Sequence, residues 1–460
     1  MTINLTKSLI REIDEFCRNH AVAETALGRL SVNDGKLVAK LRAGGAVTAS
    51  TAQRVRAFMK QSKTDKPSAS EKKANGRVVE DRGQQNFRFY DNRQKYLMFV
   101  NTCSEKWVVA DRVASELEHI RPRPPALRVF DAGMGDGTVL ARVMRAMHHR
   151  FEKYPFYIAG KEISLEDVRL TLEKMPDRFF EHPATALALT NLPYAEAPWL
   201  TPRDPVETGR LVWKEVALTG ATTAEFERQI TELQGFLAEN WRAAVSKKTG
   251  NPVYQKPVAL ILYREDCRFV LDGVLPRRGF VNADFDLVLA SQPYRARAST
   301  TFKAKHVVTP LARALGPGGR LIGIHSHGGD PGLEIVRRVW PEETPFHTNR
   351  QDLLREVRAQ LGKDAHNFQL TPGADSKALF RYDMHTLPGE IDQESASIGT
   401  STLLAAWNAA VYVAQIEDER LSEAMANSAY INATRDVLRE HGGLWFNDES
   451  YVITRKRDLA

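Results

Sequence analysis

The sequence predicts an α/β protein with a small all-α domain at its N-terminus. Three apolar stretches have the character of buried strands, and each ends in a polar residue: 129–131, 156–161 and 285–291. The first is followed by glycines at 133, 135 and 137 and then by a helix over 138–147 with its apolar residues on one face. Strands that alternate with helices in this way are typical of an α/β sheet.

The glycine-rich turn after the first strand is the most specific of these features. Asp131 ends the strand, and Gly133, Gly135 and Gly137 follow at every second position. Glycine lets the backbone bend sharply and lets a ligand approach it closely. The helix that follows offers backbone N–H groups to an anionic or polar ligand. Glu162, at the end of the second strand, stands where nucleoside-binding folds place an acid that bonds ribose hydroxyls.

This acid-x-Gly-x-Gly-x-Gly run resembles motif I of the class I S-adenosylmethionine-dependent methyltransferases. Two later features are similar to the same family. One is the turn Gly316-Pro-Gly-Gly319, which precedes a strand over 320–325 and follows the strand over 285–291. The other is the closing segment 442–456, which we interpret as an antiparallel hairpin. The resemblance covers about residues 88–460. It implies a Rossmann-like seven-stranded sheet with inserts at about 195–256 and 341–435, and S-adenosylmethionine as cofactor. The cofactor-binding residues it implies are Asp131, Gly133, Gly135, Gly137, Glu162, Asn191 and Ser291.

Two loops compete for the methyl-acceptor site. Asn191-Leu-Pro-Tyr194 is similar to a motif of ribosomal-RNA adenine dimethyltransferases. The resemblance implies that this loop holds the exocyclic amine of a base. Ser291-Gln-Pro-Tyr294 loosely resembles the corresponding motif of amino-methylating DNA enzymes, with Gln292 in place of the first proline. Strand order favours the second loop, with Tyr294 as a catalytic residue. Asn191 would then border the adenine ring of the cofactor. Alternatively, each loop is only a proline turn with a tyrosine packed beneath it.

A histidine pair, His325-Ser-His327, follows the strand over 320–325. His325 is a candidate general base, because its ordinary pKa lies near neutrality. A His-x-His pair can also bind a metal ion, but no third ligand is near in the sequence, so no metal site is predicted.

The N-terminal part is expected to form a helical domain over residues 1–60. Its short helices resemble a helix-turn-helix domain of the phage-repressor type, with Lys36, Lys40 and Arg42 on the candidate recognition helix. The whole net charge of +7 lies in residues 1–85, which carry 16 basic and 9 acidic side chains. This asymmetry indicates an acidic binding partner, and DNA is one candidate. Residues 61–85 read as a flexible linker, and 86–460 as the methyltransferase domain.

Composition excludes some classes of protein. No apolar run reaches membrane-spanning length, and the start of the chain lacks the apolar core of a signal peptide. The three cysteines, Cys17, Cys103 and Cys267, are too far apart to predict a zinc site or a disulfide framework. We therefore expect a cytoplasmic protein. The oligomeric state stays open, with a homodimer as one option.

The leading functional hypothesis is methyl transfer to a small molecule, a protein or a nucleic acid. The alternative is a DNA-binding regulator whose methyltransferase-like domain only senses a ligand. A nicotinamide oxidoreductase is disfavoured, since the glycine spacing differs from the G-x-G-x-x-G fingerprint of dinucleotide-binding folds.

Overall fold

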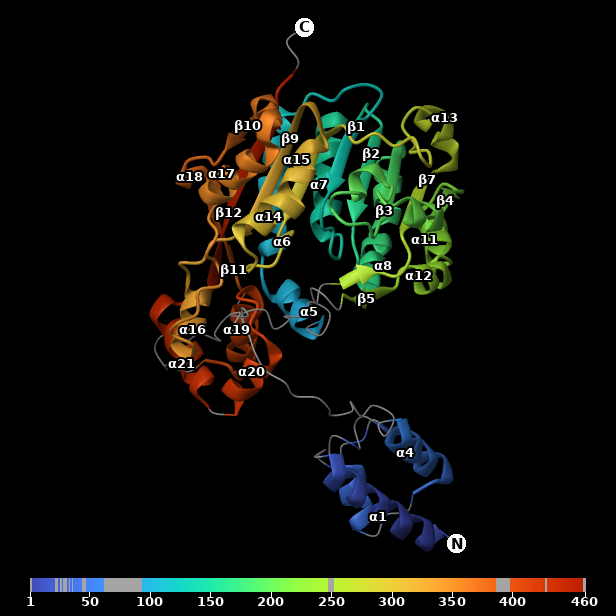
Figure 1. Cartoon of the computed structure of the whole chain (residues 1–460), viewed down its shortest axis with the longest axis vertical. Coiled ribbons are helices and arrows are strands. Elements are labelled where there is room, and N and C mark those ends of the chain that lie inside the picture. The colour runs from blue at the N-terminus through green and yellow to red at the C-terminus, as the bar shows by residue number, and fades with distance from the viewer. Residues whose placement is uncertain are drawn as a thin grey trace, which may run out of the picture. The chain divides into compact units, whose positions relative to one another are not determined.

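The computed structural model divides the chain into two compact units, Met1–Asp81 and Arg82–Ala460 (Figure 1). The structure describes residues 2–20, 36–43, 47–61, 93–246, 252–385, 398–426 and 428–457, with single positions between 24 and 34. The predicted linker over 61–85 lies outside the described residues from position 62 onward. No helix in the described ranges is long and apolar enough to cross a lipid bilayer.

The N-terminal unit contains α1 (Thr2–His20), α3 (Leu37–Arg42) and α4 (Ala49–Gln61). They share an apolar core that includes Leu9, Ile13, Val38 and Val55. The sequence also suggests a short helix over 24–30, and this segment lies mostly outside the described residues. The predicted helix over 36–42 agrees with α3 to within one residue.

Two of the three basic residues predicted to contact DNA are engaged in ion pairs inside this unit. Lys40 Nζ lies 2.8 Å from Asp34 Oδ2. Arg42 pairs with Asp14 at 2.7 Å and with Glu24 at 2.5 Å. These acidic residues offset the charge that would attract phosphate groups, so the described helices add no support for DNA binding.

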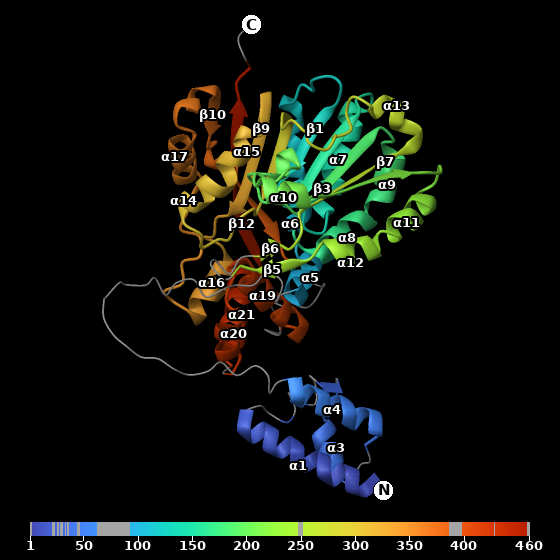
Figure 2. The same ribbon diagram turned by 45° about the vertical axis from the view of Figure 1, so that its right-hand side comes forward.

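The larger unit is built on a ten-stranded sheet (Figures 1 and 2). The order across it is β10-β12-β9-β8-β1-β2-β3-β7-β4, and β11 pairs with β12 beside β10. Strands β3, β2, β1, β8 and β9 are mutually parallel, whereas β12 is antiparallel to β9 and β7 is antiparallel to β3. The predicted α/β class is therefore confirmed. The strand bounds are β1 Leu127–Asp131, β2 Phe156–Lys161, β3 Thr185–Thr190, β4 Val212–Leu218, β7 Val258–Arg264, β8 Phe285–Ser291, β9 Leu315–Ser326, β10 Phe368–Thr371, β11 Leu379–Asp383 and β12 Trp445–Arg455.

Helices cover both faces of this sheet, each over its own apolar core. One face packs against α6 (Glu105–Ala114), α7 (Thr138–Phe151), α8 (Leu165–Glu173), α9 (Met175–Glu181), α11 (Thr223–Thr231) and α12 (Gln234–Asn240). The other packs against α13 (Arg268–Leu271), the π-helical turn η4 (Ala304–Val308), α15 (Thr309–Arg313) and α17 (Arg350–Leu361). The short helices α10 (Pro205–Arg210), α14 (Thr300–Lys303) and α18 (Asp375–Ala378) lie in the connections.

A third apolar core belongs to a helical addition beyond one end of the strands (Figures 1 and 2). It joins α5 (Arg93–Thr102), α16 (Pro331–Val339), α19 (Thr400–Val413), α20 (Asp418–Met425) and α21 (Ala429–His441). The Asn408 amide of α19 donates to the Lys95 carbonyl of α5 at 3.0 Å, and the rings of Tyr96 and Tyr412 lie 6.0 Å apart.

Two of three local predictions need correction. The segment 442–456 is one long strand, β12, and not a hairpin, because it pairs with β9 on one side and with β10 and β11 on the other. The turn expected at 316–319 is present as an irregularity within β9, where the pairing with β8 shifts register and Gly318 has φ of +79°. Within the first predicted insert the sequence predicts one helix over 223–244, but the structure has α11 and α12 there, and residues 243–245 form β5 (Ala243–Val245), which pairs with β6 (Pro252–Tyr254).

Candidate functional site

The predicted site residues converge because the strands that carry them are parallel. Asp131 ends β1, Glu162 follows β2, Asn191 follows β3, and Ser291 ends β8. His325 lies at the end of β9, where β9 pairs with β8. Carboxyl ends of parallel strands form the usual ligand crevice of α/β sheets.

The three glycines of the turn after β1 have different roles. Gly135 and Gly137 have φ of +53° and +77°, which favours glycine at both positions. A Cβ on Gly137 would lie 2.8 Å from Thr171 Cα, and one on Gly135 would lie 3.3 Å from the Tyr96 hydroxyl. A Cβ on Gly133 would meet no atom within 4 Å. Gly135 and Gly137 are therefore needed by the backbone, whereas Gly133 borders open space.

Asp131 places a buried carboxylate beside that open space. The residue is 1% exposed, and its Oδ1 accepts a hydrogen bond from Gly133 N–H at 3.1 Å. Its Oδ2 is buried and has no hydrogen-bond partner. Burial raises the pKa of Asp131 to about 7. A buried acceptor without a donor is costly, so Oδ2 is suited to a donor supplied by a ligand.

Glu162 ties the glycine turn to the end of β2. Its Oε2 accepts from Gly135 N–H at 3.0 Å, and its Oε1 accepts from Ile163 and Ser164 N–H at 2.7 and 2.8 Å. Burial raises the pKa of Glu162, with Asp167 adding to the effect. Each carboxylate oxygen can accept more than one hydrogen bond, so Glu162 can also accept from a ligand hydroxyl.

The start of α7 is less open than the sequence suggests. Thr138 N–H, one of the donors expected to face a ligand, donates to Asp136 Oδ1 at 3.3 Å. The Thr138 hydroxyl donates to Asp136 Oδ2 at 2.5 Å. Asp136 therefore engages one of the N–H groups of this helix start, and binding of a ligand to the others stays a prediction.

Asn191 stabilises the edge of the sheet. Its Nδ2 donates to the Lys256 carbonyl, and its Oδ1 accepts from Val258 N–H, both at 2.9 Å. The side chain is 2% exposed. Both polar atoms of the amide thus hold the chain entering β7, and a contact between Asn191 and the adenine ring of the cofactor stays a prediction.

The two rival acceptor loops are in direct contact. The Tyr194 hydroxyl donates to the Pro293 carbonyl at 2.6 Å, and Lys161 Nζ lies 4.7 Å from the centre of the Tyr194 ring. Tyr194 therefore supports the loop after β8. The sequence presents these loops as exclusive alternatives. In the structure they are in contact, and Tyr194 of the first loop hydrogen-bonds to the backbone of the second.

Ser291 and Gln292 form the bend between β8 and the second loop. Gln292 has φ of +47°, unusual for a residue with a side chain. Its Nε2 donates to Ser326 Oγ at 3.2 Å and to the Asp448 carboxyl group at 3.3 Å. Gln292, at the position where the amino-methylating motif has proline, thus anchors the loop to β9 and β12.

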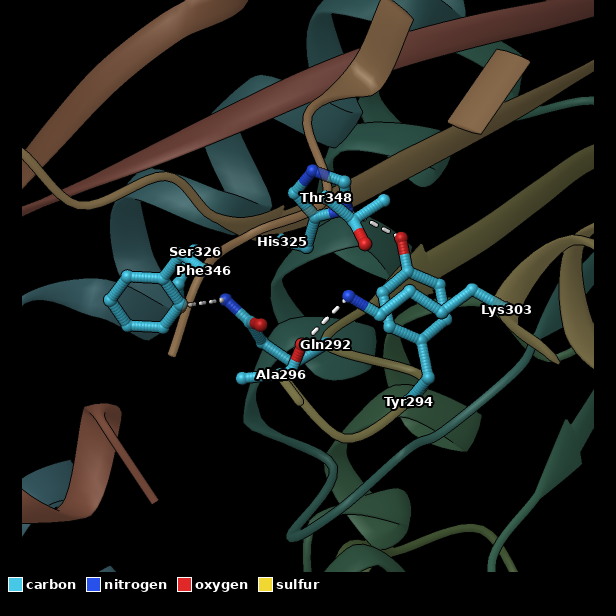
Figure 3. Close-up of a pocket in the computed structure, with 8 residues that line it drawn as sticks. All are labelled: Gln292, Tyr294, Ala296, Lys303, His325, Ser326, Phe346 and Thr348. Carbon is cyan, nitrogen blue, oxygen red and sulfur yellow. Dashed lines mark hydrogen bonds between the residues drawn. The ribbon is translucent and has the colours of Figure 1, made fainter. Parts of the chain in front are cut away.

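Tyr294 and His325, the two predicted catalytic residues, are hydrogen-bonded to each other (Figure 3). The Tyr294 hydroxyl lies 2.5 Å from His325 Nδ1, and His325 Nε2 lies 2.7 Å from Glu449 Oε1. An ionised Glu449 only accepts, so Nε2 carries the imidazole proton and Nδ1 accepts from the tyrosine. Burial lowers the pKa of His325, which keeps it neutral. We call Tyr294, His325 and Glu449 the relay.

Glu449 is held in its ionised form by the groups around it. Its Oε2 pairs with Arg350 Nη1 at 2.7 Å, and its Oε1 accepts from Arg350 N–H at 2.8 Å. His327 Nδ1 lies 3.5 Å from Oε2. Burial opposes this charge, but the contacts with His325 and Arg350 outweigh it and lower the pKa of Glu449 to about 2. The relay therefore ends in a fixed negative charge.

The relay opens onto a small cavity with a buried lysine (Figure 3). Lys303 is 3% exposed, its Nζ donates to the Ala296 carbonyl at 2.8 Å, and it lies 5.2 Å from the centre of the Tyr294 ring. Burial lowers the pKa of Lys303 to about 8. The residues that line this cavity are Gln292, Tyr294, Ala296, Lys303, His325, Ser326, Phe346 and Thr348.

Sequence reasoning missed Lys303, Glu449 and Arg350. One signal was available for Glu449: the polar run Asp448-Glu449-Ser450 interrupts an apolar closing strand, and the structure shows that all three residues are buried. Charged residues are almost never fully buried unless they are paired, so such a run marks a built site. No sequence pattern distinguishes Lys303 from an exposed helix lysine.

The second predicted insert borders this site. Ala296 N–H donates to Gln415 Oε1 at 3.0 Å, and Arg297 donates to the Ala414 and Gln415 carbonyls at 2.7 Å. Arg297 and Arg420 both pair with Glu343. The segment after Tyr294 is thus fastened to residues from 341–435.

Comparisons with known proteins find similarity only among solved structures. No family model matches the chain, and no curated protein matches it. A geranyl diphosphate methyltransferase in complex with GPP and sinefungin is 12% identical, over 75% of this chain and 77% of that chain, with a TM-score of 0.29. Phosphoethanolamine N-methyltransferase 2 of Haemonchus contortus is 11% identical, over 82% of this chain and 61% of that one, with a TM-score of 0.30. PKMT2 from Rickettsia typhi is 11% identical, over 78% and 55%, with a TM-score of 0.24. Similarity this low carries no functional inference.

Proposed function

We propose that the chain is an S-adenosylmethionine-dependent methyltransferase of class I. The observation that carries this proposal is the ligand cradle after β1. It combines open space at Gly133 with the unpartnered Oδ2 of Asp131. Glu162, on the neighbouring strand end, bonds the same turn. These residues suit a ligand with an ammonium group at one end and ribose hydroxyls at the other.

Each residue of the cradle has a stated part in this proposal. When bound, S-adenosylmethionine supplies a methyl group activated by a sulfonium centre. Asp131 Oδ2 accepts from the ammonium group of its methionine moiety, and Gly133 leaves room for that moiety. Glu162 accepts from the ribose hydroxyls. Ser291, at the end of β8, borders the cofactor beside the acceptor loop.

The relay handles the acceptor proton. The acceptor atom sits against the Tyr294 hydroxyl and gives its proton to that oxygen, while the tyrosine proton moves to His325 Nδ1. Glu449, 2.7 Å from Nε2, stabilises the imidazolium that forms. Tyr294 is the catalytic residue at the acceptor, and His325 and Glu449 act through it. Positioned general bases of this kind contribute about 10²–10⁴-fold in rate.

The sensor alternative has less support. A domain that only senses a ligand has no use for a buried, fully bonded relay beside the cradle. The ion pairs of Lys40 and Arg42 also weigh against DNA contact by residues 1–60. A helix-turn-helix function, a homodimer and a cytoplasmic location stay predictions.

Calorimetry with S-adenosylmethionine tests the proposal. Gly133→Val places a side chain in the open space without a positive φ to strain it, so we expect binding to be lost while the thermal unfolding temperature stays the same. Gly209→Val is the matched control, since a Cβ there also meets nothing within 4 Å and the residue is exposed in α10. Equal affinity in wild type and Gly133→Val would contradict the cradle. Gly135→Val is a poorer test, because φ there is +53°.

A further inference from the structure

We propose that the methyl acceptor is an ionisable hydroxyl group, phenolic or enolic, and that Lys303 is the counter-ion of its oxygen. This inference rests on the proposed function and names the substrate class for the same site. It excludes the amine acceptor that the Asn191–Tyr194 loop suggests. The argument follows from the charges around the relay cavity.

Lys303 brings a positive charge into the cavity without a carboxylate partner. Among the described residues its Nζ donates one hydrogen bond, to the Ala296 carbonyl, and otherwise lies over the Tyr294 ring, with no carboxylate within 4.0 Å. An ammonium group has three donors, so donor capacity remains for a ligand. A buried charge is costly unless it is paired, which makes this ammonium a site for an anionic oxygen.

The negative groups nearby do not cancel this charge. Glu449 is already paired with Arg350, which is itself 2% exposed. Asp448 is fully buried, and burial raises its pKa well above the ordinary value, which disfavours its charged form. Burial, with the charge of Lys303 adding to it, lowers the pKa of both His325 and His347, so neither histidine competes with Lys303 as a cation. Among the residues that line the cavity, Lys303 is the one lysine or arginine and none is a carboxylate, and its Nζ lies 5.2 Å from the centre of the Tyr294 ring.

This charge selects between the two kinds of nucleophile. A neutral amine gains positive charge as its nitrogen bonds to the methyl carbon, which Lys303 would oppose. A hydroxyl that has lost its proton starts negative and becomes neutral as the oxygen–carbon bond forms and the carbon–sulfur bond breaks. The sulfur keeps the electron pair of the broken bond, and the proton rests on the relay. Lys303 favours that deprotonation, because a cation lowers the pKa of a neighbouring hydroxyl.

The groups that would hold an amine are already engaged elsewhere. Both polar atoms of the Asn191 amide bond to the backbone of residues 256–258. The Tyr194 hydroxyl donates to the Pro293 carbonyl. Neither side chain is placed to orient an exocyclic amine.

The test uses 4-nitrophenol, whose ionised form absorbs in the visible, and its isosteric amine 4-nitroaniline. The full-length protein is saturated with S-adenosylhomocysteine, and each probe is titrated with pH. We expect wild type to lower the apparent pKa of bound 4-nitrophenol by about 1–3 units, as an opposite charge within a few ångströms does. Lys303→Met abolishes the shift. The control Lys305→Met removes an exposed lysine from the same helical segment, and we expect this variant to retain the pKa shift of bound 4-nitrophenol.

The outcomes separate this inference from the proposed function. A shift in wild type and Lys305→Met that disappears in Lys303→Met supports the hydroxyl acceptor. No binding of 4-nitrophenol, an unchanged shift in Lys303→Met, or tighter binding of 4-nitroaniline would overturn it. S-adenosylhomocysteine binding, measured in the same samples, fails only if the cradle itself is wrong. Replacing a buried charge by an apolar side chain of similar volume is often neutral for stability, so Lys303→Met is expected to fold.

Discussion

Removing the Tyr294 hydroxyl tests the relay without changing the shape of the core. Tyr294 is 9% exposed, and its hydroxyl lies 2.5 Å from His325 Nδ1. Tyr294→Phe keeps the packed ring and deletes only the oxygen that would face the acceptor. Tyr294→Ala would instead empty the space of a buried ring, at a cost of several kcal/mol. The phenylalanine variant therefore isolates the chemistry.

Tyr294→Phe should have two effects, one on folding stability and one on turnover. The variant leaves His325 Nδ1 buried without its partner, which costs about 1–3 kcal/mol of folding stability. Loss of the group that receives the acceptor proton should lower turnover by about 10²–10⁴-fold. Affinity for S-adenosylmethionine should not change, because the cradle residues Asp131, Gly133 and Glu162 are untouched.

Tyr194→Phe is the matched control. It deletes the same atom from the adjoining loop and leaves the Pro293 carbonyl without its partner, so its stability should fall by a similar amount. Its turnover should stay within a few-fold of wild type. Transfer of a labelled methyl group to an accepted hydroxyl substrate measures turnover, and thermal denaturation measures stability. If Tyr194→Phe loses turnover and Tyr294→Phe keeps it, the relay is not the acceptor site, and an amine acceptor becomes the better account.

Two further predictions concern the cradle. Glu162→Gln should weaken S-adenosylmethionine binding by about tenfold or more in calorimetry, because charge-assisted hydrogen bonds are worth about 1.5–3 kcal/mol; normal affinity would mean that Glu162 only shapes the turn. Burial raises the pKa of Asp131 to about 7, so the folded state resists its ionisation, and the resulting loss of stability grows as the pH rises from about 4 to 7. Asp131→Asn should therefore raise the unfolding temperature at pH 8, change it little at pH 3, and weaken cofactor binding at pH 8. An unfolding temperature at pH 8 that is equal to or below that of wild type would contradict the buried, ionised carboxylate.

The cradle could be anticipated from the sequence because it is local. Asp131 and the three glycines lie within seven consecutive positions, and the strand and helix around them follow from short apolar patterns. Glu162 follows from the next strand in the chain. The parallel order of the strands then brings the predicted residues to one edge of the sheet.

The relay could not be anticipated in full because it is assembled by strand register. Glu449 lies 124 residues beyond His325, and the antiparallel pairing of β12 with β9 sets the two directly opposite each other. Reading 442–456 as a hairpin hid this pairing. The contact between Tyr194 and Pro293 likewise joins loops 99 residues apart, which explains why two supporting segments looked like competitors.

A crystal structure of the full-length protein with S-adenosylhomocysteine tests the central claim most directly. The account predicts the amino group of the ligand at Asp131 Oδ2, the space over Gly133 filled, and the ribose hydroxyls at Glu162. It also predicts the sulfur atom on the side facing Tyr294, with the relay hydrogen bonds intact. A ligand bound elsewhere, or a ligand whose sulfur atom faces away from Tyr294, would contradict it.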